Sequence, residues 1–255
     1  MTLIAPVASL STIAPARREA SRRARAKPAL VRLFDATAMG AYPVLARGLG
    51  YEFRVGASDE LRCDARAVVK AAWAAKGIAP PAEVAHVAER YDAASTWIVA
   101  YHRGSPVGAM GMLDMRIASI ALDYSRRVAP PDLDLATTRE LGRLAIVPQH
   151  RGGARTVMVG LLREMLHWSK SNGIERLFAG STEALYRVYR GFNPTARLVD
   201  PPPAGAEPAD KARYFEAMRA YGGAGALYTF EVAGASPWGV FSRFLTGELR
   251  SKGER

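Results

Sequence analysis

The stretch ELGRLAIVPQHRGGAR, at residues 140–155, decides how the rest of the chain is interpreted. Its first part has the extended character of a strand and ends at Pro148, because proline cannot continue a ladder of hydrogen bonds. A turn containing Gly152 and Gly153 follows, and residues 155–171 then carry apolar side chains at helical spacing. The unpaired backbone N–H groups at such a helix start favour an anion, and a diphosphate fits.

The turn therefore supplies a set of candidate binding residues for the diphosphate. The glycines allow close approach of the backbone, and three basic side chains add positive potential. The set is Val147, Gln149, His150, Arg151, Gly152, Gly153, Ala154 and Arg155. An ordinary strand-to-helix turn, in which the glycines only permit the bend, is the alternative. Neither the Gly-Lys-Ser/Thr of a Walker loop nor the G-x-G-x-x-G dinucleotide fingerprint is present.

Outward from this stretch, the apolar periodicity predicts strands and helices in alternation. The predicted strands are residues 51–55, 96–101, 107–113, 137–147, 174–179, 197–199 and 226–232. One predicted helix begins at Ser58-Asp59-Glu60, and four others cover residues 82–91, 155–171, 182–190 and 211–221. This order predicts one α/β domain with a mixed central sheet and helices on both faces.

The charge of the chain indicates an anionic partner or substrate. The formal net charge is +11, of which residues 1–35 contribute +5. We divide the chain into a disordered basic arm (1–28), a folded domain (29–235) and an amphipathic basic tail (236–255). Candidate partners are the phosphates of coenzyme A, an acidic carrier protein, an anionic membrane surface and nucleic acid. No zinc-finger spacing or stacked aromatic-basic signature accompanies the charge, so we do not expect nucleic acid.

Several other classes are disfavoured by the composition. The single cysteine, Cys63, excludes an intrachain disulfide, and we expect it to be a buried small apolar residue. No apolar run approaches the roughly 20 residues needed to span a bilayer. The start of the sequence lacks the basic residues of a secretory signal. We expect a cytoplasmic protein, with peripheral contact to the inner membrane face through the arm and tail. The four scattered histidines predict no metal site.

Two motifs together resemble the GNAT superfamily of acyltransferases. Residues 149–154 resemble its Q/R-x-x-G-x-G/A signature, whose loop binds the coenzyme A diphosphate, and residues 185–192 resemble its later Y…GF element. The resemblance covers about residues 50–235. It implies a GNAT-like α/β fold with a mixed, mostly antiparallel central sheet flanked by helices on both faces. It also implies that acyl-CoA or acyl carrier protein, each a phosphopantetheine thioester, serves as co-substrate, with no permanently bound cofactor.

A narrower resemblance concerns residues 140–145, which are similar to the E-x-x-R-L/F-A stretch of N-acyl amino acid synthases and autoinducer synthases. Residues 91–101 and 106–108 are similar to the early hairpin of that group. This implies transfer of a long fatty acyl chain from carrier protein or coenzyme A to the amine of an amino acid or similar small molecule. A short-chain acetyltransferase using acetyl-CoA is one alternative. A non-catalytic basic module that binds lipid or nucleic acid is another.

Amide formation from a thioester needs a base for the amine, and Glu140 is our candidate. Arg143, in the same stretch, is a second candidate catalytic residue. The alternative is that Glu140 forms an ion pair with Arg139 or Arg143. Glu140 and Arg143 are three residues apart, so they share a face of a strand only if a bulge intervenes, and Gly142 is the expected bulge position. Such a bulge would also free a backbone N–H for the thioester carbonyl.

A proton donor for the departing thiolate is the last candidate role. Tyr186 and Tyr189 are the candidates, but the GNAT pattern places its tyrosine four residues before Gly191, where this chain has Arg187. Packing is therefore an alternative for both tyrosines. A set of apolar residues could similarly line an acyl channel or form ordinary sheet core: Met110, Met112, Leu113 and Met115.

Overall fold

The computed structural model describes residues 40–75, 91–125, 127–151, 156–199 and 225–235. The predicted arm, the predicted tail and the predicted helix at 211–221 lie outside the described residues. The predicted helix at 82–91 also lies outside them, except for Tyr91, which belongs to a helical segment at residues 91–93. Within the described part of the chain, no helix is long and apolar enough to cross a membrane.

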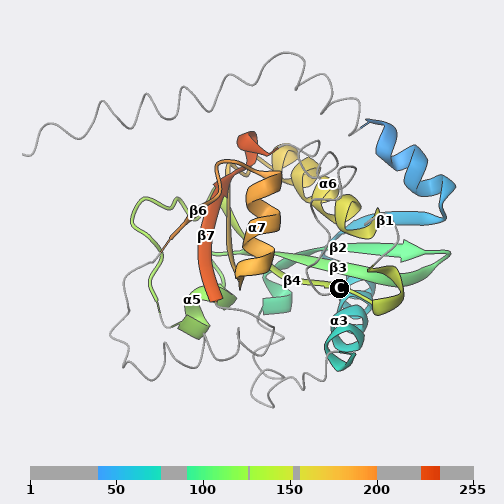
Figure 1. Ribbon diagram of the computed structural model, residues 1–255. Coiled ribbons are helices and arrows are strands. Elements are labelled where there is room, and N and C mark those ends of the chain that lie inside the picture. Colours follow the sequence, from blue (N-terminus) through green and yellow to red (C-terminus); the bar gives the residue numbers. More distant parts are fainter. Residues whose placement is uncertain (1–39, 76–90, 126, 152–155, 200–224, 236–255) are drawn as a thin grey trace, which may run out of the picture.

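The described strands form one sheet in the order β1-β2-β3-β4-β5-β7-β6 (Figure 1). Only β4 and β5 are parallel, and every other neighbouring pair is antiparallel. The bounds are β1 Tyr51–Gly56, β2 Ser95–His102, β3 Ser105–Asp114, β4 Thr138–Ile146, β5 Arg176–Thr182, β6 Arg197–Leu198 and β7 Gly225–Glu231. The predicted mixed, mostly antiparallel sheet is thus confirmed.

Helices cover both faces of the sheet, as predicted (Figure 1). Successive residues of β2 point to opposite faces, so Trp97 and Val99 pack under α3 (Asp59–Ala74), whereas Ile98 and Ala100 pack under α6 (Thr156–Ser171). The helix α7 (Glu183–Phe192) contacts β5 and β7. The short helix α5 (Ile120–Ser125), which contacts β4 and β5, was not predicted.

The predicted helix starts agree with the capping chemistry. The Ser58 side chain accepts a hydrogen bond from the backbone N–H of Leu61 at 3.3 Å and so caps α3. Thr182, the last residue of β5, caps α7 in the same way. On α3, however, Cys63 is exposed, so the expectation that it is buried was wrong. The buried residues of α3 recur at helical spacing and define the core-facing side of this amphipathic helix, and Cys63 lies on the opposite, solvent-facing side.

The ladder between β3 and β4 contains a bulge at residues 143–144, which together oppose Met110. Arg143 has a positive φ of 54°, a left-handed conformation that is uncommon for a side-chain-bearing residue. This is the two-against-one arrangement of a β-bulge whose first residue is left-handed. The predicted bulge is present, but it lies one residue later than expected, because Gly142 still pairs with Gly111.

A gap opens between the two parallel strands beside this bulge. The β4–β5 ladder ends at the pair Leu141–Ala179. Beyond that pair, β5 continues to Thr182 along β7, and β4 continues to Ile146 along β3. The edge of β4 that follows Leu141 therefore has no β5 partner among the described residues. The gap and the bulge lie directly before the turn that leads into α6.

Candidate active site

Glu140 is buried on β4, with an exposed fraction of 2%. Its carboxylate accepts a hydrogen bond from the Ser119 hydroxyl and another from the backbone N–H of Ala121, the latter at 2.9 Å. The alternative ion pairs are not formed in the described part of the chain, because Arg139 pairs with Asp114 and Arg143 pairs with a different aspartate. Both donors to Glu140 are therefore neutral groups.

The surroundings of Glu140 disfavour its charged form. Burial raises the pKa of the carboxyl to about 7, and the nearby charge of Asp123 acts in the same direction. The hydrogen bonds from Ser119 and Ala121 and the charge of Arg143 oppose this rise. A carboxyl group with a pKa near 7 can accept and release a proton at neutral pH, as a general base must.

The bulge brings Arg143 to the same face of the sheet as Glu140. The Arg143 guanidinium carbon lies 4.2 Å from the centre of the Trp97 ring. Trp97 pairs with Gly111, which pairs with Gly142, and paired residues on adjacent strands share a face. Glu140, two residues before Gly142, shares that face as well. Glu140 and Arg143 thus share a face of the sheet, as expected if a bulge lies between them.

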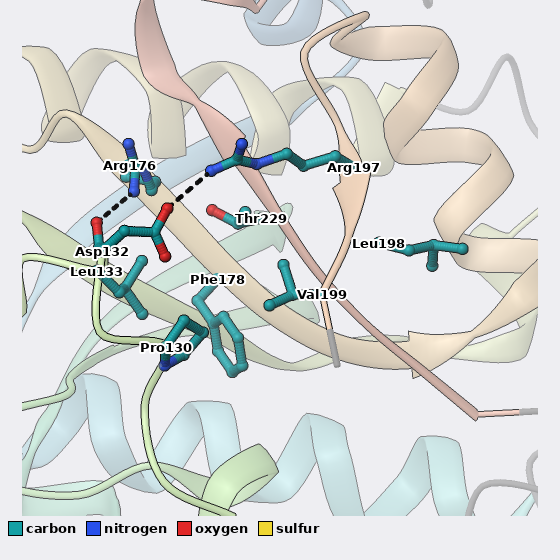
Figure 2. Close-up of a pocket in the computed structure, with 9 residues that line it drawn as sticks. All are labelled: Pro130, Asp132, Leu133, Arg176, Phe178, Arg197, Leu198, Val199 and Thr229. Atoms are coloured by element: carbon teal, nitrogen blue, oxygen red, sulfur yellow. Dashed lines mark hydrogen bonds and ion pairs between the residues drawn. The ribbon is translucent and has the colours of Figure 1, made fainter. Parts of the chain in front are cut away.

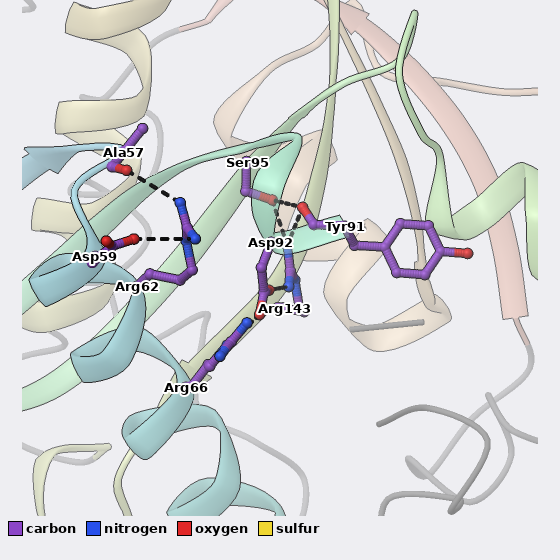
Figure 3. Close-up of polar contacts among 8 residues, drawn as sticks. All are labelled: Ala57, Asp59, Arg62, Arg66, Tyr91, Asp92, Ser95 and Arg143. Carbon is purple, nitrogen blue, oxygen red and sulfur yellow. Dashed lines mark hydrogen bonds and ion pairs between the residues drawn. The ribbon is translucent and has the colours of Figure 1, made fainter. Parts of the chain in front are cut away.

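Arg143 anchors the bulge to a buried aspartate on a neighbouring segment (Figure 3). Asp92, with an exposed fraction of 1%, accepts from Arg143 through one oxygen and from Arg66 through the other. Arg143 also donates to the Ser95 hydroxyl and, at 3.3 Å, to the carbonyl of Tyr91. Burial lowers the pKa of Arg143, and the charge of Asp92 opposes that change. The bulge of β4 is therefore tied to the start of β2.

Three residues of this site had no predicted role: Ser119, Asp92 and Arg66. Asp92 lay within the stretch that was interpreted only as an early hairpin. An aspartate directly before an apolar strand is a weak signal for a buried ion pair. Nothing in the sequence near Ser119 indicated a contact with Glu140.

The described half of the turn is a short 3-10 segment, Pro148–His150, preceded by Val147. The Nδ1 atom of His150 lies 2.9 Å from the hydroxyl of Tyr51, and the His150 ring lies 4.9 Å from that of His102. Burial and the proximity of His102 lower the pKa of His150. Gln149 is exposed.

Arg151 is engaged with backbone carbonyls. Its Nε donates to the carbonyl of Ile146 at 2.8 Å, and its Nη2 donates to the carbonyl of Ala72, near the end of α3, at 3.2 Å. Its guanidinium therefore fixes the turn to α3 and β4. The other candidate binding residues of the turn lie outside the described residues: Gly152, Gly153, Ala154 and Arg155.

The two candidate tyrosines lie on α7 against β7. Tyr189 is 2% exposed, and its ring centre lies 5.7 Å from that of Phe230 and 5.7 Å from that of Tyr228. Burial raises the pKa of Tyr189 above its usual range. Tyr186 is partly buried, with its ring centre 5.1 Å from that of Tyr228. These positions favour the packing alternative, and the role of proton donor stays a prediction.

The candidate acyl-channel residues are all buried in the sheet core. Met110 and Met112 pack beneath α6, whereas Leu113 and Met115 belong to two other apolar clusters. Their division among three separate clusters favours the core alternative. Among the described residues, no three His, Cys, Asp or Glu side chains are grouped in a way that could hold a metal ion.

The described part of the chain thus has one parallel pair, β4–β5, that separates beside a bulge, and the signature-bearing turn and α6 follow at once. The later motif lies on α7, directly after β5. The fold is of the GNAT type. No family model matches the sequence, and no curated protein matches it.

Solved structures with similar folds include three synthases. FeeM, an N-acyl amino acid synthase from uncultured soil microbes, is 14% identical with a TM-score of 0.49, covering 71% of this chain and 90% of FeeM. The AHL synthase LasI is 14% identical with a TM-score of 0.48, covering 75% of this chain and 95% of LasI. N-acetylglutamate synthase from Neisseria gonorrhoeae, complexed with coenzyme A and N-acetyl-glutamate, is 16% identical with a TM-score of 0.40. The match covers 71% of this chain and 35% of the synthase chain.

Proposed function

We propose that this protein is an N-acyltransferase that moves an acyl group from a phosphopantetheine thioester to the amine of a small molecule. The observation that carries the proposal is the bulge at residues 143–144 beside the β4–β5 gap. The gap leaves one edge of β4 open to an extended ligand, and the bulge interrupts the ladder where a carbonyl oxygen would need a donor. Both features lie within reach of the signature-bearing turn.

The donor in this proposal is acyl-CoA or acyl carrier protein, bound as a co-substrate. The phosphopantetheine arm would lie in the gap, where the backbone edge of β4 can bind its amide groups as a neighbouring strand would. The phosphate groups would lie at the turn from Val147 to Arg155, before the start of α6. The excess of basic residues supports an anionic donor, whether the phosphates of coenzyme A or an acidic carrier protein.

In the reaction, the amine nitrogen attacks the thioester carbonyl carbon, the C–N bond forms and the C–S bond breaks. Glu140 takes the proton that the amine loses. Because its carboxyl is only 2% exposed, this transfer requires a bridging water or a substrate amine that enters beside β4. A backbone N–H at the bulge stabilises the oxyanion. The thiolate is protonated in leaving, and Tyr186 or Tyr189 is the candidate donor for this step.

We further propose that the acyl group is a long fatty chain and that the acceptor is an amino acid or a similar small amine. The E-x-x-R-L-A pattern at residues 140–145 supports this branch over others. We place the activity in a domain at residues 29–235. The basic arm at 1–28 and the tail at 236–255 would hold a cytoplasmic enzyme against the anionic inner membrane face, close to a lipid product.

The test is mass spectrometry of lipid extracts from cells that express the wild-type chain, Glu140→Gln or the matched control Glu175→Gln. Glu175 is exposed and lies just before β5. We expect new N-acyl amino acids in the wild type and the control, and a loss of about 10²–10⁴-fold in Glu140→Gln. The absence of any new acylated amine, from cells that contain the folded protein, would overturn the fatty acyl assignment. Acetylation of amines by the purified chain with acetyl-CoA would instead establish the short-chain alternative.

A further inference from the structure

A crevice of about 160 Å³ lies away from the β4–β5 gap, between the loop at residues 130–133 and the sheet (Figure 2). Phe178 on β5 and Leu133 on the loop give it an apolar wall. Its polar lining comes from Asp132, Arg176, Arg197 and Thr229. An apolar wall with a few convergent polar groups is the usual composition of a small-molecule site.

Thr229 on β7 is a buried polar side chain that the protein itself does not satisfy. The residue is 4% exposed, and within the described part of the chain its hydroxyl oxygen has no hydrogen-bond partner. Figure 2 shows this hydroxyl turned toward the space between Asp132 and Arg197. Because buried hydroxyls normally have partners, a polar group that enters this space can form the hydrogen bond that the Thr229 hydroxyl otherwise lacks.

The crevice also has more guanidinium groups than carboxylates. Arg176 donates to the backbone carbonyl of Asp132 at 3.0 Å, and no carboxylate pairs with it among the described residues. Arg197 pairs with the Asp132 carboxylate at 3.3 Å, but their side chains are 59% and 42% exposed. Such an exposed pair contributes little stability and exchanges readily. Arg197 can therefore leave Asp132 for a competing carboxylate.

We propose that this crevice binds a small carboxylate that carries an apolar side chain. The ligand carboxylate takes the place of Asp132 on Arg197, receives a second hydrogen bond from Arg176 and accepts one from Thr229. Guanidinium–carboxylate contacts of this kind are short and directional. The apolar part of the ligand lies on the Phe178 ring.

The site is separate from the candidate base, although both lie on one face of the sheet. Phe178 pairs with Glu140 on β4 and with Thr229 on β7, so its ring lies between the two positions. Thr229 is therefore two strands away from Glu140, with Phe178 on the strand between them. The proposal concerns binding alone and does not depend on the acyltransferase reaction.

The experiment is a calorimetric titration of the full-length chain with phenylacetate, and with phenylacetamide as its uncharged match. The variants are Arg197→Gln and Thr229→Val, with Arg190→Gln as the control. Arg190 is an exposed arginine on α7 that does not line the crevice. Arg197 is exposed, so its replacement does not endanger folding, and valine keeps the shape of threonine while removing the hydroxyl.

We expect phenylacetate to bind and phenylacetamide to bind at least about 10-fold more weakly, because the charged contacts are lost. Arg197→Gln should weaken phenylacetate binding by about 10- to 100-fold, and Thr229→Val by about 3- to 10-fold. The control should bind as the wild type does. The proposal is overturned if phenylacetate does not bind, if the amide binds equally well, or if both variants bind phenylacetate unchanged.

Discussion

Two buried carboxylates on the same side of the sheet differ in what compensates their charge. Asp92, 1% exposed, lies between the guanidinium groups of Arg66 and Arg143. Among the described residues, Glu140, 2% exposed, accepts only from a hydroxyl and a backbone N–H. The depth of burial is the same, and the partners are ionic in one case and neutral in the other.

This difference separates a structural role from a chemical one. Two guanidinium groups neutralise Asp92 in place, so that it fixes the start of β2 to the bulge of β4. Neutral donors leave Glu140 free to exchange a proton near pH 7, where its pKa lies. Arg143 connects the two, because it pairs with Asp92 and its charge also acts on Glu140. We therefore expect substitutions at Asp92 to change stability and substitutions at Glu140 to change proton chemistry.

The largest expected effect on stability is that of Asp92→Asn. Removing one partner of a buried ion pair leaves an unpaired charge, and the free energy of unfolding should fall by about 3–5 kcal/mol. Urea unfolding followed by circular dichroism measures this change. Asp59→Asn is the matched control, because Asp59 forms a surface pair with Arg62 and is 92% exposed. Equal losses in unfolding free energy for Asp92→Asn and Asp59→Asn would contradict a special structural role of the buried Asp92 ion pair.

In contrast to Asp92→Asn, Glu140→Gln should raise the free energy of unfolding above neutral pH. The folded-state pKa of Glu140 is raised from its ordinary 4.5 to about 7, so the folded chain binds this proton more tightly than the unfolded chain does. The contribution of Glu140 is fully present below pH 4.5 and is lost as pH rises through 7. Glutamine removes the cost of ionisation, so the variant should match the wild type near pH 4 and exceed it by up to roughly 3 kcal/mol at pH 8.

Unfolding of both chains at pH 4, 6 and 8 provides the measurement. Parallel stability curves for wild type and Glu140→Gln would show that Glu140 does not titrate between pH 4.5 and 7. A lower stability of the variant at pH 8 would show that the ionised carboxylate is needed for packing. Either result would remove the contrast with Asp92.

The sequence predicts the fold well where the signal is local. The strands β1 to β5 and the helices α3 and α6 follow from apolar periodicity and from caps such as Ser58, which act within a few residues. The helix α5 was missed because six residues contain too little of the 3.6-residue period. Its first turn nevertheless supplies one of the two donors to Glu140.

The partners in the candidate site could not be predicted, because they are distant in the chain. Asp92 and Arg143 are 51 residues apart, and Ser119 and Glu140 are 21 apart. The bulge was predicted from the requirement that Glu140 and Arg143 share a face. Its position was misplaced at Gly142 because glycine adopts positive φ most readily. The structure puts the strained conformation at Arg143, whose contacts with Asp92 hold it there.

Ser119→Ala should move the pH dependence of activity. The Ser119 hydroxyl donates to the Glu140 carboxylate, and this contact lowers the pKa of Glu140. Without it, the pKa of Glu140 rises, so the acid limb of the kcat/KM profile should shift upward by about one pH unit. Ser119→Thr keeps the hydroxyl and should restore the wild-type profile. The Ser119 hydroxyl also accepts a hydrogen bond from the backbone N–H of Leu122 in α5 at 3.2 Å. A uniform loss of activity at every pH would indicate that Ser119 only caps α5.

The smallest expected effect is that of Arg66→Gln, which tests which arginine holds Asp92. The Arg66 side chain is 45% exposed, whereas that of Arg143 is 12% exposed. Water can replace Arg66 at the surface while Arg143 keeps its pair with Asp92, so the loss in unfolding free energy should not exceed about 1 kcal/mol. A double-mutant cycle with Asp92→Asn measures the coupling directly. A coupling as large as the whole effect of Asp92→Asn would mean that Asp92 is held from the α3 side, and Arg143 would then be available for substrate.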